Sequence, residues 1–356
     1  MNCLTCFLGG SSPTGFRTHF DEMINDTRYY TYIIKGGPGT GKSSLMKRLA
    51  EAFPDEDKEI YHCSSDPDSL DAVVFLEHKV IFVDGTAPHC FDPEYPGAVQ
   101  QILNLGEFWD ARRLKKNKEG VMSATADYLQ HHARCRRYIT ALSEVMGDTS
   151  QIGRSALDEE KLDSFVNRLA KKVLPKKSSD EGKIQYRQLS AITPRGYHTY
   201  IPEGYETYLL SDRLYAGSER FLRKLTDIAC KKGYTISISV CTLYNTEKFE
   251  HILIPELKLA FLTATPINEL VLQEKQVINF RRFYDKKTLS ARKLRVRFNE
   301  AAVRNLLDEA VSSLVSAKSE HDKLEQYYID AVDFDGVNRL CYSLISQIKG
   351  GEPPLA

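Results

Sequence analysis

The sequence predicts an α/β protein made of two similar domains, each with a parallel sheet and an added helical segment, that arose by tandem duplication. Three observations predict this fold class. Short β-branched runs alternate with segments of helical pattern, which is typical of a parallel sheet covered by helices. One of these runs leads into a glycine-rich loop at the start of a helix. The same order of motifs then appears a second time in the 356 residues.

Within the first copy, the predicted elements follow in the order strand, loop, helix, strand, helix, strand, and then a longer helical region. Each predicted strand is a short apolar or β-branched run, and each predicted helix has apolar residues at helical spacing. Residues 111–145 combine that spacing with many charged side chains, so we expect a helical hairpin outside the sheet. The predicted strands are 31–35, 59–63 and 80–83, and the predicted helices are 45–53 and 68–76.

The duplication is visible as a series of matched motifs in the same order along both halves. Identities are sparse, but the offset between matched positions drifts only from 181 to 171 residues. Collinear matches at a nearly constant offset indicate one repeated unit. The matched segments include 29–34 with 205–210, 45–49 with 221–225, 108–110 with 283–285, and 166–169 with 337–340.

The predicted boundary between the two copies is a polar stretch. Residues 176–189 have the lysine, serine, aspartate and glycine content of a linker. The first predicted domain is therefore 1–175, and the second is 190–356.

Composition and charge favour a cytoplasmic protein with no membrane partner and no strong attraction to nucleic acid. Lysine plus arginine balance aspartate plus glutamate at 48 each, and 42% of the residues are hydrophobic. No apolar run reaches the roughly 18 residues that a membrane span needs. The eight cysteines are scattered, so reduced thiols are expected. Cys3 and Cys6 have the spacing of half a zinc site, without a second pair at the required distance.

The clearest functional motif is the loop Gly36-Gly37-Pro38-Gly39-Thr40-Gly41-Lys42-Ser43, followed by Ser44. It matches the P-loop pattern G-x-x-x-x-G-K-S/T between an apolar strand and a helix. The glycines let successive backbone N–H groups turn toward a polyphosphate, and the positive end of the helix adds to the attraction. Lys42 is predicted to contact the terminal phosphates, and Ser43 to bind Mg²⁺. The sequence therefore predicts ATP with Mg²⁺ as the ligand, and P-loop NTPase-like domains.

A Mg²⁺ site also requires a carboxylate at the end of a buried strand, and Asp84 follows the apolar run 80–83. Asp84 is therefore the second predicted metal ligand, although an aspartate before Gly85 is also a common way to open a turn. Gly85 stands where many hydrolysing P-loop ATPases carry a glutamate that activates water, so fast hydrolysis by that route is doubtful. The stiff segment 86–97 that follows is either a substrate loop or a connection.

A second polar cluster, residues 62–69, follows the predicted strand 59–63. A carboxylate there lies at the carboxyl edge of the sheet, where open α/β sheets bind ligands. Asp66 is a candidate for the group that orients or deprotonates an acceptor, yet an aspartate before Pro67 is equally typical of a helix N-cap. The predicted catalytic residues are thus Lys42, Asp84 and Asp66, whereas Asp68, His62 and His89 are interpreted as solvated or packed.

The second copy has lost the phosphate ligands. In an ungapped alignment of the two copies, Ser218 is aligned with Lys42, and Glu219 is aligned with Ser43. Loss of the lysine removes a charge-assisted phosphate contact, and a neighbouring carboxylate repels the anion. We therefore predict a pseudo-domain, with one nucleotide per chain bound in the first half. The residues that remain for a separate binding surface in the second half are Arg213 and Arg220.

The loop resembles those of AAA-type ATPases and P-loop kinases. Over its whole length, the chain is similar to a family of bacterial proteins described as ATPases and built from two P-loop-like halves. The resemblance implies nucleotide binding and assigns no substrate. The residues that carry it are the 36–44 loop, the 62–70 cluster, Asp84 to His89, and Thr193-Pro194-x-Gly196.

Three functions are compatible with these features. The first is an ATPase or ATP-driven switch, whose site is completed by an arginine from elsewhere and whose small-molecule or protein partner is unknown. The second is a kinase for a small molecule or nucleotide, favoured by Gly85 and Asp66. The third is a nucleic-acid-associated ATPase that uses the basic runs 112–118 and 281–297. The candidate arginines are Arg112, Arg113, Arg134, Arg136 and Arg137.

Overall fold

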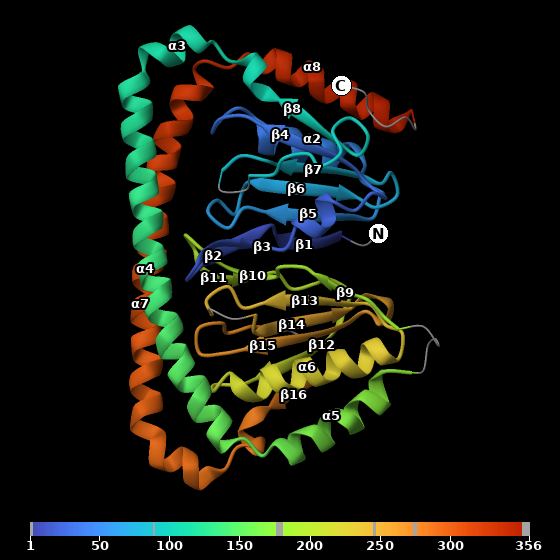
Figure 1. Cartoon of the computed structure of the whole chain (residues 1–356), viewed down its shortest axis with the longest axis vertical. Coiled ribbons are helices and arrows are strands. Elements are labelled where there is room, and N and C mark those ends of the chain that lie inside the picture. Colours follow the sequence, from blue (N-terminus) through green and yellow to red (C-terminus); the bar gives the residue numbers. More distant parts are fainter. Residues whose placement is uncertain (1–2, 88–89, 176–180, 245–246, 273–275, 351–356) are drawn as a thin grey trace. The chain divides into compact units, whose positions relative to one another are not determined.

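The computed structural model describes residues 3–87, 90–175, 181–244, 247–272 and 276–350 (Figure 1). The chain divides into two compact units, and each is made of segments far apart in the sequence. The first unit comprises Met1–Gly10, Thr18–Cys135 and Ser312–Ala356, and the second comprises Ser11–Arg17 and Arg136–Val311.

The first unit contains a six-stranded sheet in the order β1-β5-β6-β7-β4-β8. Neighbouring strands are parallel, except that β6 runs antiparallel to both β5 and β7. Helix α2 (Lys42–Ala52) covers one face, where Leu45, Met46 and Leu49 enter the apolar core. The strands are β1 (Cys3–Phe7), β4 (Tyr30–Lys35), β5 (Lys58–His62), β6 (Leu70–Phe75), β7 (Val80–Asp84) and β8 (Gln100–Asn104).

The second unit contains a six-stranded sheet of matching topology, in the order β16-β12-β15-β14-β13-β9. Here β14 is the antiparallel strand between β13 and β15, and α6 (Ala216–Lys231) takes the place of α2. Lys79 and Lys258 precede matching strands, and both have a positive φ, of 56° and 47°. The two sheets thus agree strand for strand, as a duplication requires. The strands are β9 (Ile184–Tyr186), β12 (Glu206–Ser211), β13 (Ile236–Val240), β14 (Phe249–Ile254), β15 (Leu259–Ala264) and β16 (Gln276–Asn279).

The segment 68–76, predicted to be helical, instead contains the strand β6, so this prediction was wrong. All six residues of β6 are buried. A short apolar run such as this one fits a strand buried on both faces as well as it fits a helix, and the periodicity does not separate the two. Because β6 is antiparallel, each sheet is mixed and mostly parallel, whereas the prediction was a wholly parallel sheet.

Short elements complete both halves, and most of them occur in pairs. The small two-stranded sheets are β2 (Gly9–Ser12) with β3 (Gly15–Thr18), and β10 (Ser190–Thr193) with β11 (Gly196–Thr199). The short helices are α1 (Asp21–Ile24), η1 (Leu105–Phe108), η2 (Pro255–Leu257) and η3 (Phe280–Phe283).

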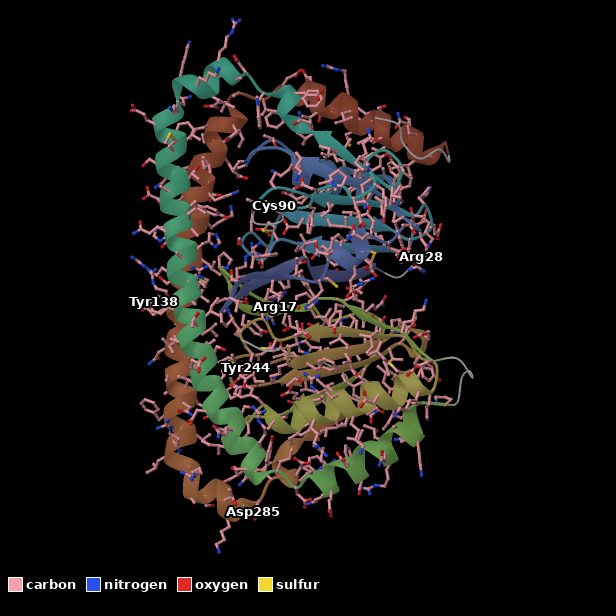
Figure 2. All side chains as sticks on the ribbon, in the orientation of Figure 1. Arg17, Arg28, Cys90, Tyr138, Tyr244 and Asp285 are labelled. Carbon is pink, nitrogen blue, oxygen red and sulfur yellow. The ribbon has the colours of Figure 1, made fainter. Side chains whose placement is uncertain are left out.

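The region after Trp109 is a short helix and a very long one, whereas a hairpin was predicted. Asp110 and Asp285 begin the matching helical regions of the two halves, and each carboxylate accepts backbone N–H groups of the first turn (Figure 2 labels Asp285). In each unit, α4 and α7 lie side by side and antiparallel (Figure 1). These helices are α3 (Ala111–Lys116), α4 (Lys118–Ala156) and α7 (Lys286–Ile329).

The last helix of each half packs on the sheet of the other half. Helix α5 (Glu159–Val173) lies against α6 and η3, and α8 (Phe334–Lys349) lies against α2 and η1 (Figure 1). Val166 and Ala170 accordingly join the core of the second sheet. Val337 and Leu344 join the core of the first. The sequence halves have therefore exchanged their terminal helices.

This exchange changes the domain description. The compact units differ from the predicted consecutive domains 1–175 and 190–356, because each includes helices from both halves. Part of the predicted linker 176–189 is also structured, since β9 pairs with β13 in the second sheet. Residues 176–180 of that linker lie outside the described part of the chain.

No helix within the described ranges is long and apolar enough to cross a membrane. All eight cysteines are present as thiols. Cys3 is exposed and Cys6 is buried, and neither belongs to the group of possible metal ligands found among the described residues.

Candidate functional site

The glycine-rich loop connects β4 to α2 at the carboxyl edge of the first sheet. Gly39 and Gly41 have φ angles of 67° and 92°, in the left-handed region that glycine adopts at little cost. Thr40 is buried, and its hydroxyl donates to the Gly37 carbonyl at 2.8 Å. Gly41 is the N-cap of α2 and has no side chain with which to cap it. The first N–H groups of α2 therefore point out of the helix end, an arrangement that suits an anion.

Lys42 is held between this loop and the end of β7. Its Nζ atom donates to the carbonyls of Gly36 (2.9 Å) and Gly37 (2.8 Å), and lies 3.7 Å from Asp84 Oδ2. The Lys42 side chain is 10% exposed. The structure thus brings together two residues, Lys42 and Asp84, that the sequence predicted to share a site.

Two carboxylates lie near each other at this corner. Asp71 precedes Ala72, which pairs with Val83 in the antiparallel pair β6–β7, and Asp84 follows Val83. The two like charges repel, and the charge of Asp71 acts on Asp84. Asp71 is 5% exposed, so the pair is largely removed from water. Burial raises the pKa of Asp84; Lys42 opposes the rise and Asp71 adds to it. A cation at this point relieves the repulsion.

Asp84 also forms the turn that its place before Gly85 suggested. Its Oδ1 atom accepts from the Thr86 N–H (2.8 Å) and the Thr86 hydroxyl (2.5 Å), whereas Oδ2 faces Lys42. Gly85 is tightly enclosed, because a Cβ atom there would lie 2.4 Å from Ile33 Cγ2. A glutamate therefore does not fit at this position, and any activation of water needs another residue.

Ser43 joins the same corner of the sheet. Its hydroxyl oxygen accepts from the Leu70 N–H at 2.9 Å, which fixes the start of β6 beside the first turn of α2. Asp71 follows Leu70 directly. Phe82 packs in the core beneath α2, so Asp84, two residues further along β7, also faces α2. The hydroxyl and both carboxylates are oxygen donors of the kind that Mg²⁺ prefers.

The segment between β5 and β6 is a loop, so Asp66 does not cap a helix. Its Oδ2 atom accepts from the Ser69 hydroxyl (2.8 Å) and lies 3.6 Å from Lys318 Nζ. His62 Nδ1 lies 2.8 Å from the Pro67 carbonyl oxygen, and burial lowers the pKa of His62. His62 therefore supports the loop, and Asp66 faces a lysine from the second half of the sequence. The exposed residues near these loops are Ser44 and Asp68.

One face of α7 lies against both loops. A Cβ atom on Gly37 would lie 2.4 Å from the Tyr328 ring, and one on Gly39 would lie 2.8 Å from the Glu325 carbonyl oxygen. Lys318, two turns earlier on the same face, reaches the β5–β6 loop. The glycines therefore also permit the close approach of α7. This α7 face consists of Lys318, His321, Glu325 and Tyr328.

Helix α4 adds aromatic and imidazole groups on this side. The Tyr128 ring centroid lies 4.5 Å from that of His132 and 5.5 Å from that of His321. Burial lowers the pKa of His132 to about 4, and it also lowers the pKa of His321. Both imidazoles are therefore neutral near pH 7, and His321 lies near Asp66 without adding positive charge.

A second group of possible metal ligands lies on α7. His321, Asp322 and Glu325 have ligand atoms within 4.8 Å of one another. The cation at this place is Lys318, which pairs with both Asp322 and Asp66. Partial burial lowers the pKa of Lys318, but the hydrogen bond to Asp322 and the charge of Asp66 outweigh it, so the pKa is raised. Lys318 therefore already supplies a positive charge to Asp322, one of the three possible ligands.

Other predicted residues lie elsewhere. The five candidate arginines of α3 and α4 are all exposed, and Tyr128 and His132 are the α4 residues that reach the α7 face. Lys35 Nζ donates to the carbonyls of Gly85 (2.8 Å) and Phe91 (2.7 Å), so it ties down the segment after β7. Pro88 and His89 lie outside the described residues.

The matching loop of the second unit is closed by its own side chains. Asp212, aligned with Gly36, is 1% exposed and accepts from the N–H groups of Leu214 (3.0 Å) and Ser218 (2.8 Å). The Tyr284 hydroxyl donates to the same carboxylate (2.9 Å) and accepts from the Gly217 N–H (2.7 Å). Backbone groups that face outward in the first unit therefore have protein partners here.

Charged residues near this second loop are also engaged. Arg213 pairs with Glu300 at 2.6 Å, and Arg220 pairs with Asp163 at 2.9 Å, so both already have carboxylate partners. Tyr215, aligned with Gly39, keeps a positive φ of 62°. The loop thus keeps one positive φ angle, but α6 begins at Ala216, two residues earlier than α2 in this alignment, and Gly217 has no positive φ to match that of Gly41.

Two residues of the site were missed from the sequence. Asp71 interrupts an otherwise apolar six-residue run, which is a signal for a buried carboxylate once the run is assigned to a strand. Lys318 carries no such signal, because it lies on a charged helix of the other half. No family model, curated protein or solved structure was found to match the chain.

Proposed function

We propose that the chain binds ATP with Mg²⁺ at the 36–43 loop of the first unit and hydrolyses it. The observation that carries the proposal is the convergence of Lys42, Ser43 and Asp84 at one sheet corner, at the uncapped start of α2. A helix end of this kind attracts phosphate, and Lys42 adds a charge for the terminal groups. The second unit lacks these features, so we expect one nucleotide per chain.

Mg²⁺ fits the donors that surround this corner. Ser43 and Asp84 are the proposed ligands, and the carboxylate of Asp71 supplies a third oxygen donor nearby. Buried like charges favour a divalent cation between them, since the cation removes their repulsion. When bound, Mg²⁺ would bridge the phosphates and neutralise part of their charge.

Hydrolysis at this site depends on a group other than residue 85. Asp66 is the proposed carboxylate that orients the attacking water, because its loop is joined to Ser43 through the Leu70 N–H. Its partner Lys318 lies on the α7 face that covers the glycine-rich loop.

A second candidate function is phosphoryl transfer to a small hydroxyl-bearing molecule. The observation that favours it is the group of Tyr128, His132 and His321, in which both imidazoles are neutral and His321 lies near Asp66. Such groups offer hydrogen bonds to an acceptor and repel no anion. Hydrolysis remains the main proposal, because it requires no acceptor.

Calorimetric titration of the purified chain with a non-hydrolysable ATP analogue and Mg²⁺ tests nucleotide binding. We expect a single site per chain. Release of ADP from ATP is then measured alone, with pooled metabolites, and with DNA or RNA. Release of ADP without additions supports hydrolysis, whereas release that requires metabolites supports a kinase. Release that DNA or RNA stimulates supports a nucleic-acid-associated ATPase. Two equal sites, or none, would contradict the proposal.

Replacement of Asp84 by asparagine is expected to raise the Mg²⁺ concentration needed for half-maximal nucleotide binding about tenfold or more. The reason is that the metal loses a charged ligand. Binding of ATP without metal should be unchanged or slightly stronger, since a negative charge is removed. Titration of Mg²⁺ at a fixed concentration of fluorescent ATP measures both effects. Asp68→Asn, at an exposed position, is the matched control. A Mg²⁺ curve that does not move would show that Asp84 serves the turn alone.

A further inference from the structure

We propose that Lys318 is the cation that contacts the γ-phosphoryl group during hydrolysis, brought to the glycine-rich loop by a helix from the second half of the sequence. This inference rests on the proposed function and adds a catalytic residue to it. It assigns to Lys318 the role considered for an arginine of residues 112–137, for each of which a solvated helix face was the favoured interpretation and all of which are exposed.

Contacts on two sides place Lys318 near the far end of a bound triphosphate. Its Nζ atom lies 3.6 Å from Asp66, which accepts a hydrogen bond from Ser69. The next residue, Leu70, donates its N–H to the Ser43 hydroxyl oxygen at 2.9 Å. The hydroxyl proposed to bind Mg²⁺ and the Lys318 ammonium group therefore belong to one short chain of contacts. Further along α7, the helix touches the glycines that cradle the phosphates.

The Lys318 side chain has both the charge and the freedom for this role. It is 28% exposed, and the ion-pair partners found for it within the described ranges are the carboxylates of Asp66 and Asp322. A lysine has a flexible four-carbon stem and three donors, so it can exchange one carboxylate for a phosphoryl oxygen. Lys42 approaches the phosphates from the loop and Lys318 from α7, which places positive charge on two sides of the transferring group.

The second unit provides an internal comparison. With the offset of 175 between Asp110 and Asp285, the counterpart of Lys318 is Ser143 on α4. Ser143 is 2% exposed, and its hydroxyl has no hydrogen-bond partner among the described residues. It lines a cavity of about 640 Å³ together with Tyr244, which Figure 2 labels. The second unit therefore has a serine in place of both lysines, Ser218 for Lys42 and Ser143 for Lys318.

In the proposed step, the oxygen of a water molecule forms a bond to the γ-phosphorus. The bond from that phosphorus to the β–γ bridging oxygen breaks, and its electron pair stays on ADP. One proton of the water passes by way of Asp66 to solvent, and the other stays on the inorganic phosphate. As Lys318 moves to the equatorial oxygens, Asp66 loses its ion pair and becomes able to accept that proton.

The test compares Lys318→Met, which removes the charge, with Lys318→Arg, which keeps it. Lys323→Met is the matched control, because Lys323 is 63% exposed on the same helix and pairs with Glu320. Affinity is measured for Mg-ADP alone and for Mg-ADP with aluminium fluoride, which mimics the transferring phosphoryl group. Single-turnover hydrolysis is measured in parallel. Lys318→Met should lower the rate and the aluminium fluoride affinity about 10²-fold, and change Mg-ADP affinity by no more than about twofold.

The remaining outcomes separate this inference from the proposed function. Substantial activity in Lys318→Arg and wild-type values in Lys323→Met would support the inference. Equal aluminium fluoride affinity in Lys318→Met and wild type would overturn it, as would a parallel loss of Mg-ADP affinity, which indicates a structural role. If the wild type binds neither Mg-ADP nor its aluminium fluoride complex, the proposed function fails, and this inference fails with it.

Discussion

Replacement of Lys42 by alanine is expected to lower ATP turnover about 10³-fold and to weaken Mg-ATP binding while the fold is retained. The physical reason is that Lys42 contacts the loop carbonyls and Asp84 and contributes little to the apolar core. Its loss leaves the nearby carboxylates of Asp84 and Asp71 without the Lys42 ammonium group. Single-turnover hydrolysis and calorimetric titration with a non-hydrolysable analogue measure the two effects separately.

The control for this variant is Lys47→Ala, which removes an exposed lysine from the same helix. Circular dichroism and thermal unfolding should show both variants folded. A folded Lys42→Ala protein with wild-type affinity and turnover would remove the 36–43 loop from the site. Loss of activity in both variants would point to general damage of α2.

Local pattern predicted most elements of the fold, but not the partners of the terminal helices. The strands β4 and β7 were found because each contains a compact run of β-branched or apolar residues beside a turn signal. Strand β6 was predicted to be a helix, since a six-residue segment that is apolar except for Asp71 has no decisive period. The exchange of α5 and α8 could not be predicted from the sequence, because both helices present similar apolar faces and the two sheets are alike. An amphipathic pattern shows that a helix needs a sheet, but not which of two related sheets it covers.

Some residues of the candidate site were predicted from the sequence, and others were missed. Lys42 and Asp84 were predicted together because each is defined by short-range context, a loop before a helix and the end of a buried strand. Asp71 was missed because its nearness to Asp84 depends on an antiparallel register. Lys318 was missed because it comes from a distant helix, so that only the folded chain reveals its contact with Asp66.

In the second unit, a buried carboxylate lies at the start of α6. The Asp212 carboxylate accepts hydrogen bonds from the N–H groups of Leu214 and Ser218 and from the Tyr284 hydroxyl. The start of a helix is also the place where backbone N–H groups can bind a phosphate. Asp212, which is 1% exposed, therefore supplies an internal anion at the position that a bound anion is proposed to take in the first unit.

Replacement of Asp212 by glycine, the residue of the first copy, is therefore expected to destabilise the second unit by about 3 kcal/mol or more. Three buried donors lose their acceptor, and each unsatisfied group costs about 1–3 kcal/mol. Hydrogen exchange of peptides from β12 and α6 measures the loss locally, with Asp227→Gly on the exposed side of α6 as the control. Inorganic phosphate should restore part of the protection in Asp212→Gly, because it can enter the uncapped helix start, and should leave the wild type unchanged. Wild-type exchange in Asp212→Gly would show that the carboxylate is dispensable. Destabilisation that phosphate does not relieve would show that the loop no longer forms an anion site.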